Sequence, residues 1–311
     1  LLDSSPRGTA ADAFRLVSGN AGEHKLVYAL LRAANQSPRY DGFLATLDEP
    51  TYEPTDRLLV KRGSQIVAHV QVLDRLAWFH GVRLPVGGLQ DLAVLPEYRD
   101  LGYDRLRLAA AEQQMHHRGA ILGIVRTDQP DLFREAGWCE AIGQRATRAN
   151  IHEVLARLDV APSVTGRRSR ALHTRLWRHV ELEALDGVYR HLHTSAWGAL
   201  DRSEPYWRWL VGRKAHDELI VGVHGRDDWS ELESPAQIVG YAVTHGSCVL
   251  ELATHSGFSK AAAHLLARAC QDAIEQGHRE VSLHLPVCDP LHESMLAAGG
   301  EWAGGGCRGV L

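Results

Sequence analysis

The same order of strands, helices and glycine stops is expected twice in this chain, once in each half. In each copy an apolar strand leads through a loop into an amphipathic helix, then a second strand, then a short helix that ends at a glycine. The first copy spans residues 89–137 and the second spans residues 249–299. Strands that alternate with helices must pack in layers, so the sequence predicts an α/β (α+β) protein with two tandem domains.

The sheets are expected to be mixed and mainly antiparallel, with helices flanking them. Apolar and polar residues alternate at 58–61, 66–73 and 77–84, which predicts an antiparallel meander. Residues 89–95 are more uniformly apolar, which indicates a buried strand at the end of that meander.

The chain of 311 residues is long enough for two domains with separate cores. A stretch rich in Pro, Ser, Thr and Gly, followed by a basic run, predicts a linker at 161–170. We therefore expect an N-terminal domain at 1–160 and a C-terminal domain at 171–311.

Composition argues against several classes of partner. The net charge is −4, which disfavours a nucleic-acid-binding surface, and the apolar runs are too short to span a bilayer. The five cysteines are odd in number and widely spaced, so we predict a reducing, cytoplasmic location without a disulfide framework. None of the 18 histidines belongs to a set with zinc-like spacing, so no metal site is predicted.

The most informative segment runs from Leu92 through Pro96 and Gly102 into the following helix. A strand that ends in a loop at a helix N-terminus presents backbone N–H groups and partial positive charge, which suits a phosphate. Asp100 and Asp104 place negative charge at the same point. Either carboxylate could instead cap the helix, in which case the loop has another use.

Two motifs carry a resemblance to a known family. They are Val94-x-Pro96-x-x-Arg99-x-x-Gly102 and Leu132-Phe133-Arg134-Glu135-Ala136-Gly137-Trp138. The chain resembles the GNAT acetyltransferases, and its tandem order is similar to that of the Eis type of bacterial N-acetyltransferase. Arg105 also fits that subgroup, whereas its sterol-carrier-like third domain is not expected here.

The resemblance implies an N-acyltransferase that moves an acetyl group from acetyl-CoA to a primary amine of a small molecule or a peptide. It implies that Leu92, Ala93 and Val94 serve the pantetheine arm of acetyl-CoA. The residues implied to serve the phosphates are Arg99, Asp100, Leu101, Gly102, Tyr103, Asp104 and Arg105.

The chain departs from the family pattern at three positions. Asp104 stands where a small residue is usual, and Asp100 stands where Gly or Arg is common. Phe133 replaces the tyrosine that usually protonates the leaving thiolate. These departures leave open a catalytically inactive tandem protein that binds a ligand or partner. A cell-wall type of aminoacyltransferase is a third alternative, which the lack of a basic surface disfavours.

Acetyl transfer to an amine needs a base that takes the amine proton. Asp91, at the start of the expected cofactor strand, and His80, on the meander, are the candidates. In Eis-type enzymes the C-terminal carboxylate enters the active site, which here would be that of Leu311.

Four aromatic residues are read either as lining of an acceptor pocket or as core. They are Tyr40, Tyr52, Trp78 and Phe79. In the second domain the loop at 254–259 has no basic residue before Lys260, so that domain is predicted to be a structural partner. Whether the chain forms a homo-oligomer is left open.

Overall fold

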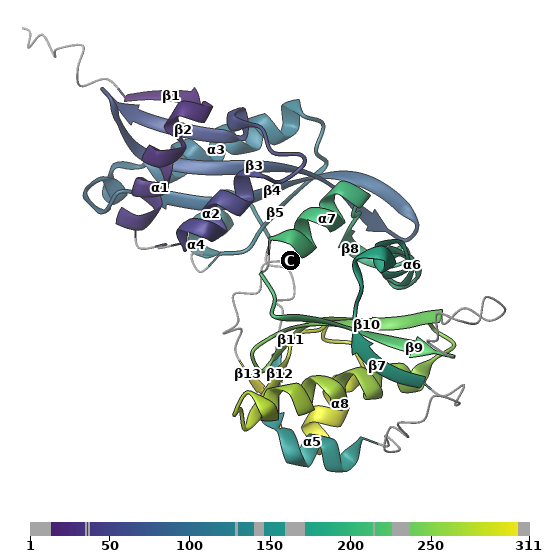
Figure 1. Cartoon of the computed structure of the whole chain (residues 1–311). Helices are drawn as coiled ribbons and strands as arrows, with labels where there is room; N and C mark the ends of the chain where they lie inside the picture. Colours follow the sequence, from purple (N-terminus) through teal and green to yellow (C-terminus); the bar gives the residue numbers. More distant parts are fainter. Residues whose placement is uncertain are drawn as a thin grey trace, which may run out of the picture. The chain divides into compact units, whose positions relative to one another are not determined.

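In a computed structural model the chain forms two compact units. Unit 1 comprises Leu1–Ala141 and Trp197–Asp201, and unit 2 comprises Ile142–Ala196 and Arg202–Leu311. Each unit has a mixed sheet with helices packed on it (Figure 1). The structure describes residues 14–34, 36, 38–127, 130–139, 146–158, 172–213, 215–225 and 237–303.

The sheet of unit 1 follows chain order for its first five strands, and the strand from 197–200 pairs with its third strand. The first four strands pair antiparallel, and the fifth pairs parallel with the fourth. The strands are β1 (Phe14–Ser18), β2 (Arg57–Arg62), β3 (Gln65–Phe79), β4 (Val82–Val94), β5 (Leu122–Val125) and β8 (Trp197–Leu200).

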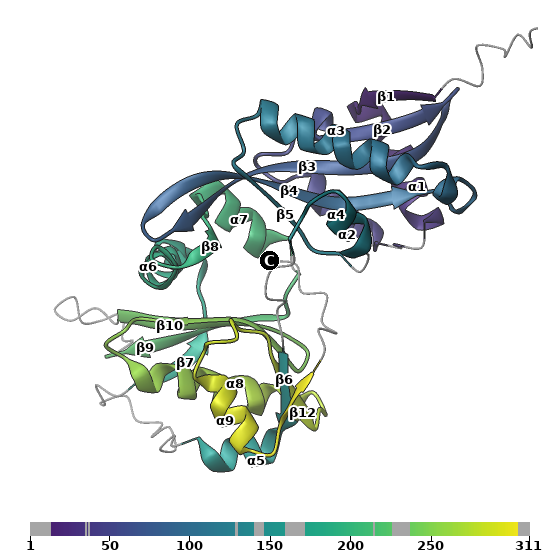
Figure 2. The ribbon, with the colours of Figure 1, turned by 180° about the vertical axis from the view of Figure 1, so that it is seen from behind.

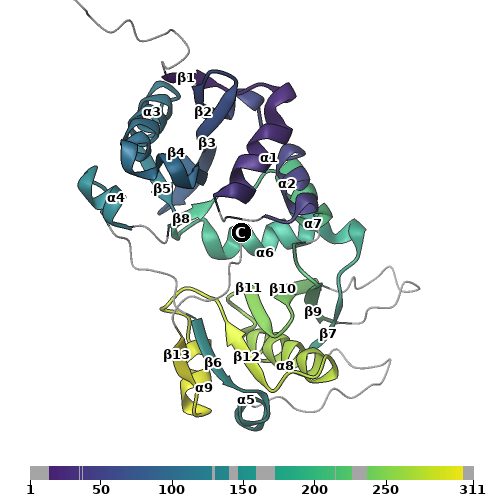
Figure 3. The ribbon, with the colours of Figure 1, turned by 90° about the vertical axis from the view of Figure 1, so that its left-hand side faces the viewer.

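Helices cover both faces of this sheet, which Figure 3 shows edge-on with α3 on one side and α1 and α2 on the other. The α1 side is filled by a core around Leu31, Leu59 and Val67, and the α3 side by a core around Leu108 and Met115. The helices are α1 (His24–Ala33), α2 (Tyr40–Leu47), α3 (Tyr103–His117), α4 (Pro130–Glu135) and the short turns η2 (Ala21–Glu23), η3 (Pro54–Asp56) and η4 (Pro96–Leu101).

The expected meander forms, but with a different turn. Residues 66–73 and 77–84 were expected as separate strands, whereas β3 and β4 make one long hairpin that turns between Phe79 and Val82. His80 and Gly81 both have positive φ, at 48° and 85°, as a two-residue hairpin turn requires. Asp74 and Arg75 lie within β3 and do not interrupt it.

Unit 2 has a sheet in the order β13-β6-β12-β11-β10-β9-β7. The strands are β6 (Ala146–Asn150), β7 (Leu172–Leu176), β9 (Glu218–His224), β10 (Gln237–His245), β11 (Cys248–Thr254), β12 (Glu280–Leu283) and β13 (Glu301–Ala303). Helix α8 packs on β9, β10 and β11, and α6 packs on β10 and β11. The helices are α5 (Ile151–Arg157), η5 (His179–Glu181), α6 (Leu182–His193), α7 (Glu204–Gly212), α8 (Ser259–Glu275) and α9 (Leu291–Ala297).

Strand β6 lies within the expected N-terminal domain at 1–160 but belongs to the sheet of unit 2. It lies between β12 and β13 and pairs antiparallel with both, as Figure 2 shows. Its Ala146 and Ala149 are buried, and α5 packs against α8. The units therefore divide after Ala141 rather than at 160, because residues 146–157 bury their apolar side chains in the second core. The expected linker at 161–170 lies outside the described residues.

The two units share a register that makes their positions comparable. At the end of β4 the Leu95 N–H donates to the Val67 carbonyl at 2.9 Å, and after β11 the His255 N–H donates to the Val239 carbonyl at 2.8 Å. Counting back two residues from these bonds, Ala93 pairs with His69 and Ala253 pairs with Tyr241. Asp91 in unit 1 and Glu251 in unit 2 each stand four residues before the residue that makes this bond, and the two acids are counterparts in this sense. Their cross-strand pairing differs, because Val243 pairs with Glu251, whereas a register shift pairs Gln71 with Gln90.

No described helix has both the length and the apolar character needed to cross a bilayer.

Candidate functional site

A loop at the N-terminus of α3 has the geometry expected of an anion site. Pro96–Leu101 forms one 3₁₀ turn, and Gly102 follows it with φ +79°, a conformation that glycine adopts without strain. The first helical bond of α3 joins the Leu106 N–H to the Gly102 carbonyl at 3.2 Å. No side chain at the Gly102 cap accepts from the helix, so the N–H groups of its first turn are available to a ligand.

Asp104 does not cap these N–H groups. Its carboxylate accepts a hydrogen bond from the Arg107 guanidinium, one turn further along α3. Arg107 is buried and also donates to the His69 carbonyl at 3.2 Å. Burial lowers the pKa of Arg107 to about 10, against the opposing effect of Asp104, so the guanidinium keeps its charge at neutral pH. The Asp104 charge is thereby partly neutralised, while the side chain of Asp100 lies outside the described residues.

The other predicted phosphate-binding residues differ in whether their side chains could reach a ligand. Arg99 Nη2 donates to the Ala34 carbonyl at 3.4 Å, and the exposed Arg105 pairs with Glu135 at 2.5 Å. Tyr103 is buried, with its ring centroid 4.5 Å from that of Phe14. Only the main chain of Tyr103 can therefore serve a ligand, whereas the two arginines can exchange partners at little cost.

The segment predicted for the pantetheine arm lies at an open edge. Pairing of β4 with β5 ends at Leu89, so Leu92, Ala93 and Val94 extend beyond it. Because Leu95 bonds to β3 and successive residues of a strand face opposite edges, the main-chain groups of Val94 point away from β3. The Leu92 carbonyl accepts a hydrogen bond from the Gln36 side chain.

Asp91 lies in an irregularity of β4 just before this edge. The register of β3 and β4 shifts between His69 and Gln71, which adds a residue on β4. Asp91 has φ +54°, in the left-handed region that few non-glycine residues adopt. Its side chain is 29 % exposed, and burial raises the pKa of its carboxyl against the opposing effect of Arg57. Backbone strain and a perturbed carboxyl together make Asp91 a candidate functional residue.

A buried polar cluster surrounds the inner side of Asp91. Arg57 Nη1 lies 3.5 Å from Asp91 Oδ2 and 3.1 Å from His69 Nε2. Arg57 Nε donates to the Tyr52 hydroxyl at 3.1 Å, and this hydroxyl lies 2.7 Å from His24 Nε2. His69 Nδ1 lies 2.8 Å from the Asp91 carbonyl. The cluster thus joins α1, the loop before β2, and strands β2, β3 and β4.

The other predicted catalytic residues lie elsewhere. His80 occupies the turn of the β3–β4 hairpin, against Trp197 at 5.6 Å between ring centroids. Since ten residues of β4 separate this turn from Asp91, the distance along the strand is roughly 30 Å. The structure therefore does not bring His80 and Asp91 together. Leu311, predicted to contribute its carboxylate, lies outside the described residues.

The four aromatic residues divide between two places. Tyr52 belongs to the cluster beside Asp91, and Tyr40 packs on Tyr28. Trp78 and Phe79 lie at the hairpin end, where Trp78 Nε1 donates to Asp201 at 3.2 Å. Among the contacts of the described residues, Tyr52 is the member of this set that joins the cluster beside Asp91.

Phe133 of α4 is buried against Trp138, with 5.4 Å between the ring centroids. A phenyl ring cannot donate a proton, and its burial places it in the core on the α3 side of the sheet. The leaving thiolate therefore receives no proton from this position.

The counterpart of Asp91 in unit 2, Glu251, is buried and fully engaged by its neighbours. Glu251 accepts two hydrogen bonds from Arg202, at 2.9 and 2.7 Å, and one from the Tyr241 hydroxyl. All three residues are buried, and Arg202 lies 4.0 Å from the ring centroid of Tyr189. Burial alone would raise the pKa of Glu251, but Arg202 and Tyr241 hold it below its usual range. This carboxylate is buried and already accepts three hydrogen bonds, so a substrate cannot reach it as it could reach an exposed base.

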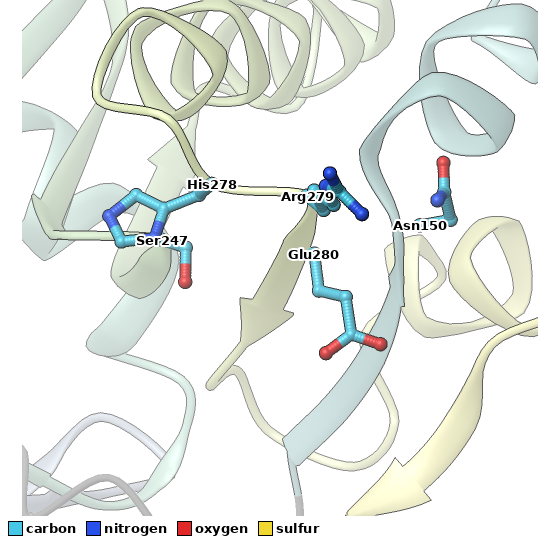
Figure 4. A pocket seen from close by; sticks show the side chains of 5 residues that line it. All are labelled: Asn150, Ser247, His278, Arg279 and Glu280. Atoms are coloured by element: carbon cyan, nitrogen blue, oxygen red, sulfur yellow. The ribbon is translucent and has the colours of Figure 1, made fainter.

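Unit 2 also has a surface hollow, lined by Asn150, Ser247, His278, Arg279 and Glu280 (Figure 4). Ser247 precedes β11, whereas the counterpart of the unit 1 loop follows β11. The hollow thus lies at the opposite end of that strand from the counterpart of the candidate site. Within the described ranges no group of three or more His, Cys, Asp or Glu side chains could hold a metal ion.

Arg57 and His69 were not identified from the sequence. Each is a polar residue next to apolar residues of its strand, and both are at most 1 % exposed. Polar groups that deeply buried are retained in strands only with partners, which is the signal that could have selected them.

Comparisons with known proteins agree with this geometry. The family described as an acetyltransferase (GNAT) domain matches residues 16–141. No curated protein matches the chain. Residues 16–141 are thus similar to GNAT acetyltransferase domains.

Solved structures extend the likeness to both units. A GCN5-related N-acetyltransferase from Kribbella flavida is 19 % identical with a TM-score of 0.67, covering 92 % of this chain and 67 % of its own. Eis1 from Mycobacterium abscessus is 18 % identical with a TM-score of 0.61, covering 94 % and 71 %. Saccharomyces cerevisiae N-myristoyltransferase with bound myristoyl-CoA is 12 % identical with a TM-score of 0.56, covering 90 % and 74 %. The chain therefore has the two-unit GNAT fold seen in Eis1.

Proposed function

We propose that this protein is a cytoplasmic N-acyltransferase that transfers an acetyl group from acetyl-CoA to a primary amine. The observation that carries the proposal is Asp91, a partly exposed carboxylate with a raised pKa beside the open edge of β4. The site lies in unit 1, and unit 2 has a structural role because its counterpart Glu251 is saturated.

The residues present fit acetyl-CoA. The N–H groups at the start of α3, with Arg99 and Arg105, would hold the phosphates. The main chain of Leu92, Ala93 and Val94 would pair with the pantetheine arm, which requires the Gln36 side chain to release the Leu92 carbonyl. Acetyl-CoA supplies the activated acetyl group as a thioester.

Asp91 would act as the general base. Its carboxylate takes a proton from the ammonium group of the acceptor, which leaves the nitrogen with a lone pair for attack. The C–N bond then forms as the C–S bond of the thioester breaks, and the nitrogen releases its second proton to solvent as the amide forms. The thiolate leaves without a proton from Phe133. A carboxyl of raised pKa is a stronger base than an ordinary aspartate, which favours the first step.

A non-catalytic tandem protein that binds a CoA-type ligand is the second candidate. The buried Phe133 favours it, because the position that usually donates a proton in this family cannot do so. Substantial CoA binding without transfer to a panel of small and peptidyl amines would select this candidate.

Calorimetric titration with acetyl-CoA tests the cofactor site. The unmodified chain should bind, and Asp104→Asn should bind several-fold more tightly. Removing one charge near the phosphates relieves a repulsion of about 1 kcal/mol at roughly 4 Å in water, and each 1.4 kcal/mol is tenfold in affinity. Asp131→Asn is the matched control, since Asp131 forms the same i,i+3 pair with Arg134 on α4. Absence of binding by both the unmodified chain and Asp104→Asn would overturn the proposal.

A further inference from the structure

The main chain of Asp91 is held by His69. The His69 Nδ1 atom faces the Asp91 carbonyl oxygen, which can only accept, so this nitrogen carries the proton. The His69 Nε2 atom faces a guanidinium N–H, which can only donate, so this nitrogen carries a lone pair. These partners assign one neutral tautomer. Complete burial, with Arg57 nearby, lowers the pKa of His69 to about 3, which keeps that tautomer across the neutral range.

The carboxylate of Asp91 is held by Arg57. The same Nη1 atom that contacts His69 lies 3.5 Å from Asp91 Oδ2. The guanidinium is itself fixed, because its Nε bonds to Tyr52 and its plane lies over the rings of Phe43 and Tyr52 at 5.2 and 5.4 Å. Since its side chain is 1 % exposed, solvent does not weaken the attraction to Asp91 from the inner side.

A residue with positive φ needs such support. Asp91 pays a conformational cost of about 1–3 kcal/mol in the left-handed region, which persists only when surrounding contacts oppose it. His69 fixes the peptide after Asp91, and Arg57 fixes its side chain. Arg107 holds the His69 carbonyl from the α3 side, so the clamp is anchored from both faces of the sheet.

We infer that Arg57 and His69 are positioning residues that hold the main chain and the carboxylate of Asp91 together in the geometry of a general base. The inference rests on the proposed function, in which Asp91 takes the amine proton. The groups that face Asp91 or adjoin this pair are His24 from α1, Tyr52 from the loop before β2, Arg57 from β2, His69 from β3 and Arg107 from α3. Among them Arg57 is the charge nearest the carboxylate.

Substitution of Arg57 separates charge from geometry. Arg57→Gln removes the positive charge while burial remains, so the acidic limb of the pH profile of kcat/KM should move to higher pH. Arg57→Lys keeps the charge but loses the fixed guanidinium that contacts both His69 and Asp91. The acidic limb of its pH profile should therefore stay closer to that of the unmodified protein. Both variants should lose about 10–100-fold in kcat, since misplacement by about 1 Å can cost 10²-fold.

Substitution of His69 tests the main-chain contact. Glutamine can donate to the Asp91 carbonyl and accept from Arg57, so His69→Gln should recover most of the activity that His69→Phe loses. Arg202→Lys is the matched control for Arg57→Lys, because it changes another buried arginine paired with a carboxylate in unit 2. It should reduce stability without moving the acidic limb.

A second readout does not depend on turnover. Carbon-13 NMR of the labelled Asp91 carboxyl, in the full chain with CoA added, should report a titration at higher pH in Arg57→Gln. Thermal unfolding and CoA affinity measured on the same samples identify any variant that has lost its fold. If Asp91→Asn is as active as the unmodified protein, the proposed base is wrong, while this titration still tests the clamp. A carboxyl titration and pH limb unchanged in folded Arg57→Gln would overturn the inference.

Discussion

Two carboxylates at equivalent positions in the two units have opposite properties. Asp91 is partly exposed, has a strained backbone and has a raised pKa, whereas Glu251 is buried and has a lowered pKa. The cause lies on the neighbouring strand, in the residue that pairs with Ala93 in unit 1 and with Ala253 in unit 2. His69 bonds to the main chain of Asp91, but Tyr241 bonds to the carboxylate of Glu251 itself.

The arginines that pair with these two acids, Arg57 and Arg202, differ in how many atoms they offer to the carboxylate. Arg57 offers one Nη atom to Asp91 and shares it with His69, so the carboxylate keeps room for a further partner. Arg202 instead binds both oxygens of Glu251 as a fork. A carboxylate becomes a potential base when its neighbours hold it without saturating it, and a structural element when they saturate it.

Exchange of each acid for its amide tests the comparison most strongly. Asp91→Asn should lower kcat/KM by about 10²–10⁴-fold, the usual contribution of a general base. Its fold should persist, because asparagine tolerates positive φ. Glu251→Gln should leave kcat/KM nearly unchanged under conditions where the chain is folded. Steady-state kinetics at saturating acetyl-CoA would decide, and equal losses in the two variants would contradict the comparison.

Removal of the two arginines should affect stability unequally. Arg202→Met should destabilise unit 2 by about 3–5 kcal/mol, because Glu251 would be left buried with its charge unpaired. Arg57→Met should cost unit 1 less, because the partly exposed Asp91 can reach solvent or bind a proton. Native-state hydrogen exchange of the β4 and β11 amides measures the stability of each unit separately. A larger loss in unit 1 would show that Asp91 is the more dependent of the two acids.

The dependence of stability on pH should also differ between the units. The pKa of His69 falls from 6.5 to about 3 on folding, so the unfolded chain binds a proton that the native chain does not. The stability contributed by His69 is therefore complete above pH 6.5 and is lost as the pH falls toward 3. Asp91 contributes with the opposite sign, since its raised pKa favours the native state when it is protonated.

His69→Gln should consequently flatten the loss of stability of unit 1 between pH 6.5 and pH 3. Tyr241, its counterpart, does not titrate in this range, because burial raises its pKa well above the usual value. Denaturant unfolding at a series of pH values supplies the measurement. An unchanged slope in His69→Gln would mean that His69 is protonated in the folded chain.

Loss of the Tyr241 hydroxyl is expected to have the smallest effect. Tyr241→Phe should cost about 2 kcal/mol, the range for a hydrogen bond to a charged group, because Arg202 still pairs with Glu251. Activity should not change. A loss above about 4 kcal/mol would show that the hydroxyl, rather than Arg202, is what holds the carboxylate.

Periodic elements could be predicted from the sequence because their signal is local. The helix that follows Gly102, its counterpart at 259–275 and the strand at 89–95 lie close to their expected places. The acid at 91 was identified because a carboxylate beside an apolar strand is conspicuous. Arg57 was not, because its contacts with His69 and Asp91 depend on strand register and on an added residue in β4 that no local pattern encodes.

The sheet that receives a strand is equally hard to predict. Nothing in residues 146–150, whose sequence is Ala-Thr-Arg-Ala-Asn, says that they pair with β12 and β13 of the second unit. The strand at 197–200 presents the same problem, since it pairs with β3 of the first unit. Long-range pairing is decided by which buried faces fit, and that information lies far away along the chain.

The placement of β6 has a consequence for how the chain is made. A ribosome completes β6 early, at Asn150, yet its two neighbours begin only at Glu280 and Glu301. At usual synthesis rates this strand waits on the order of ten seconds before either partner exists. During that time its main chain and apolar side chains are open to incorrect pairing or to chaperones. The second sheet can be completed only when nearly the whole protein has been translated, so a premature stop before β12 would leave β6 without either neighbouring strand.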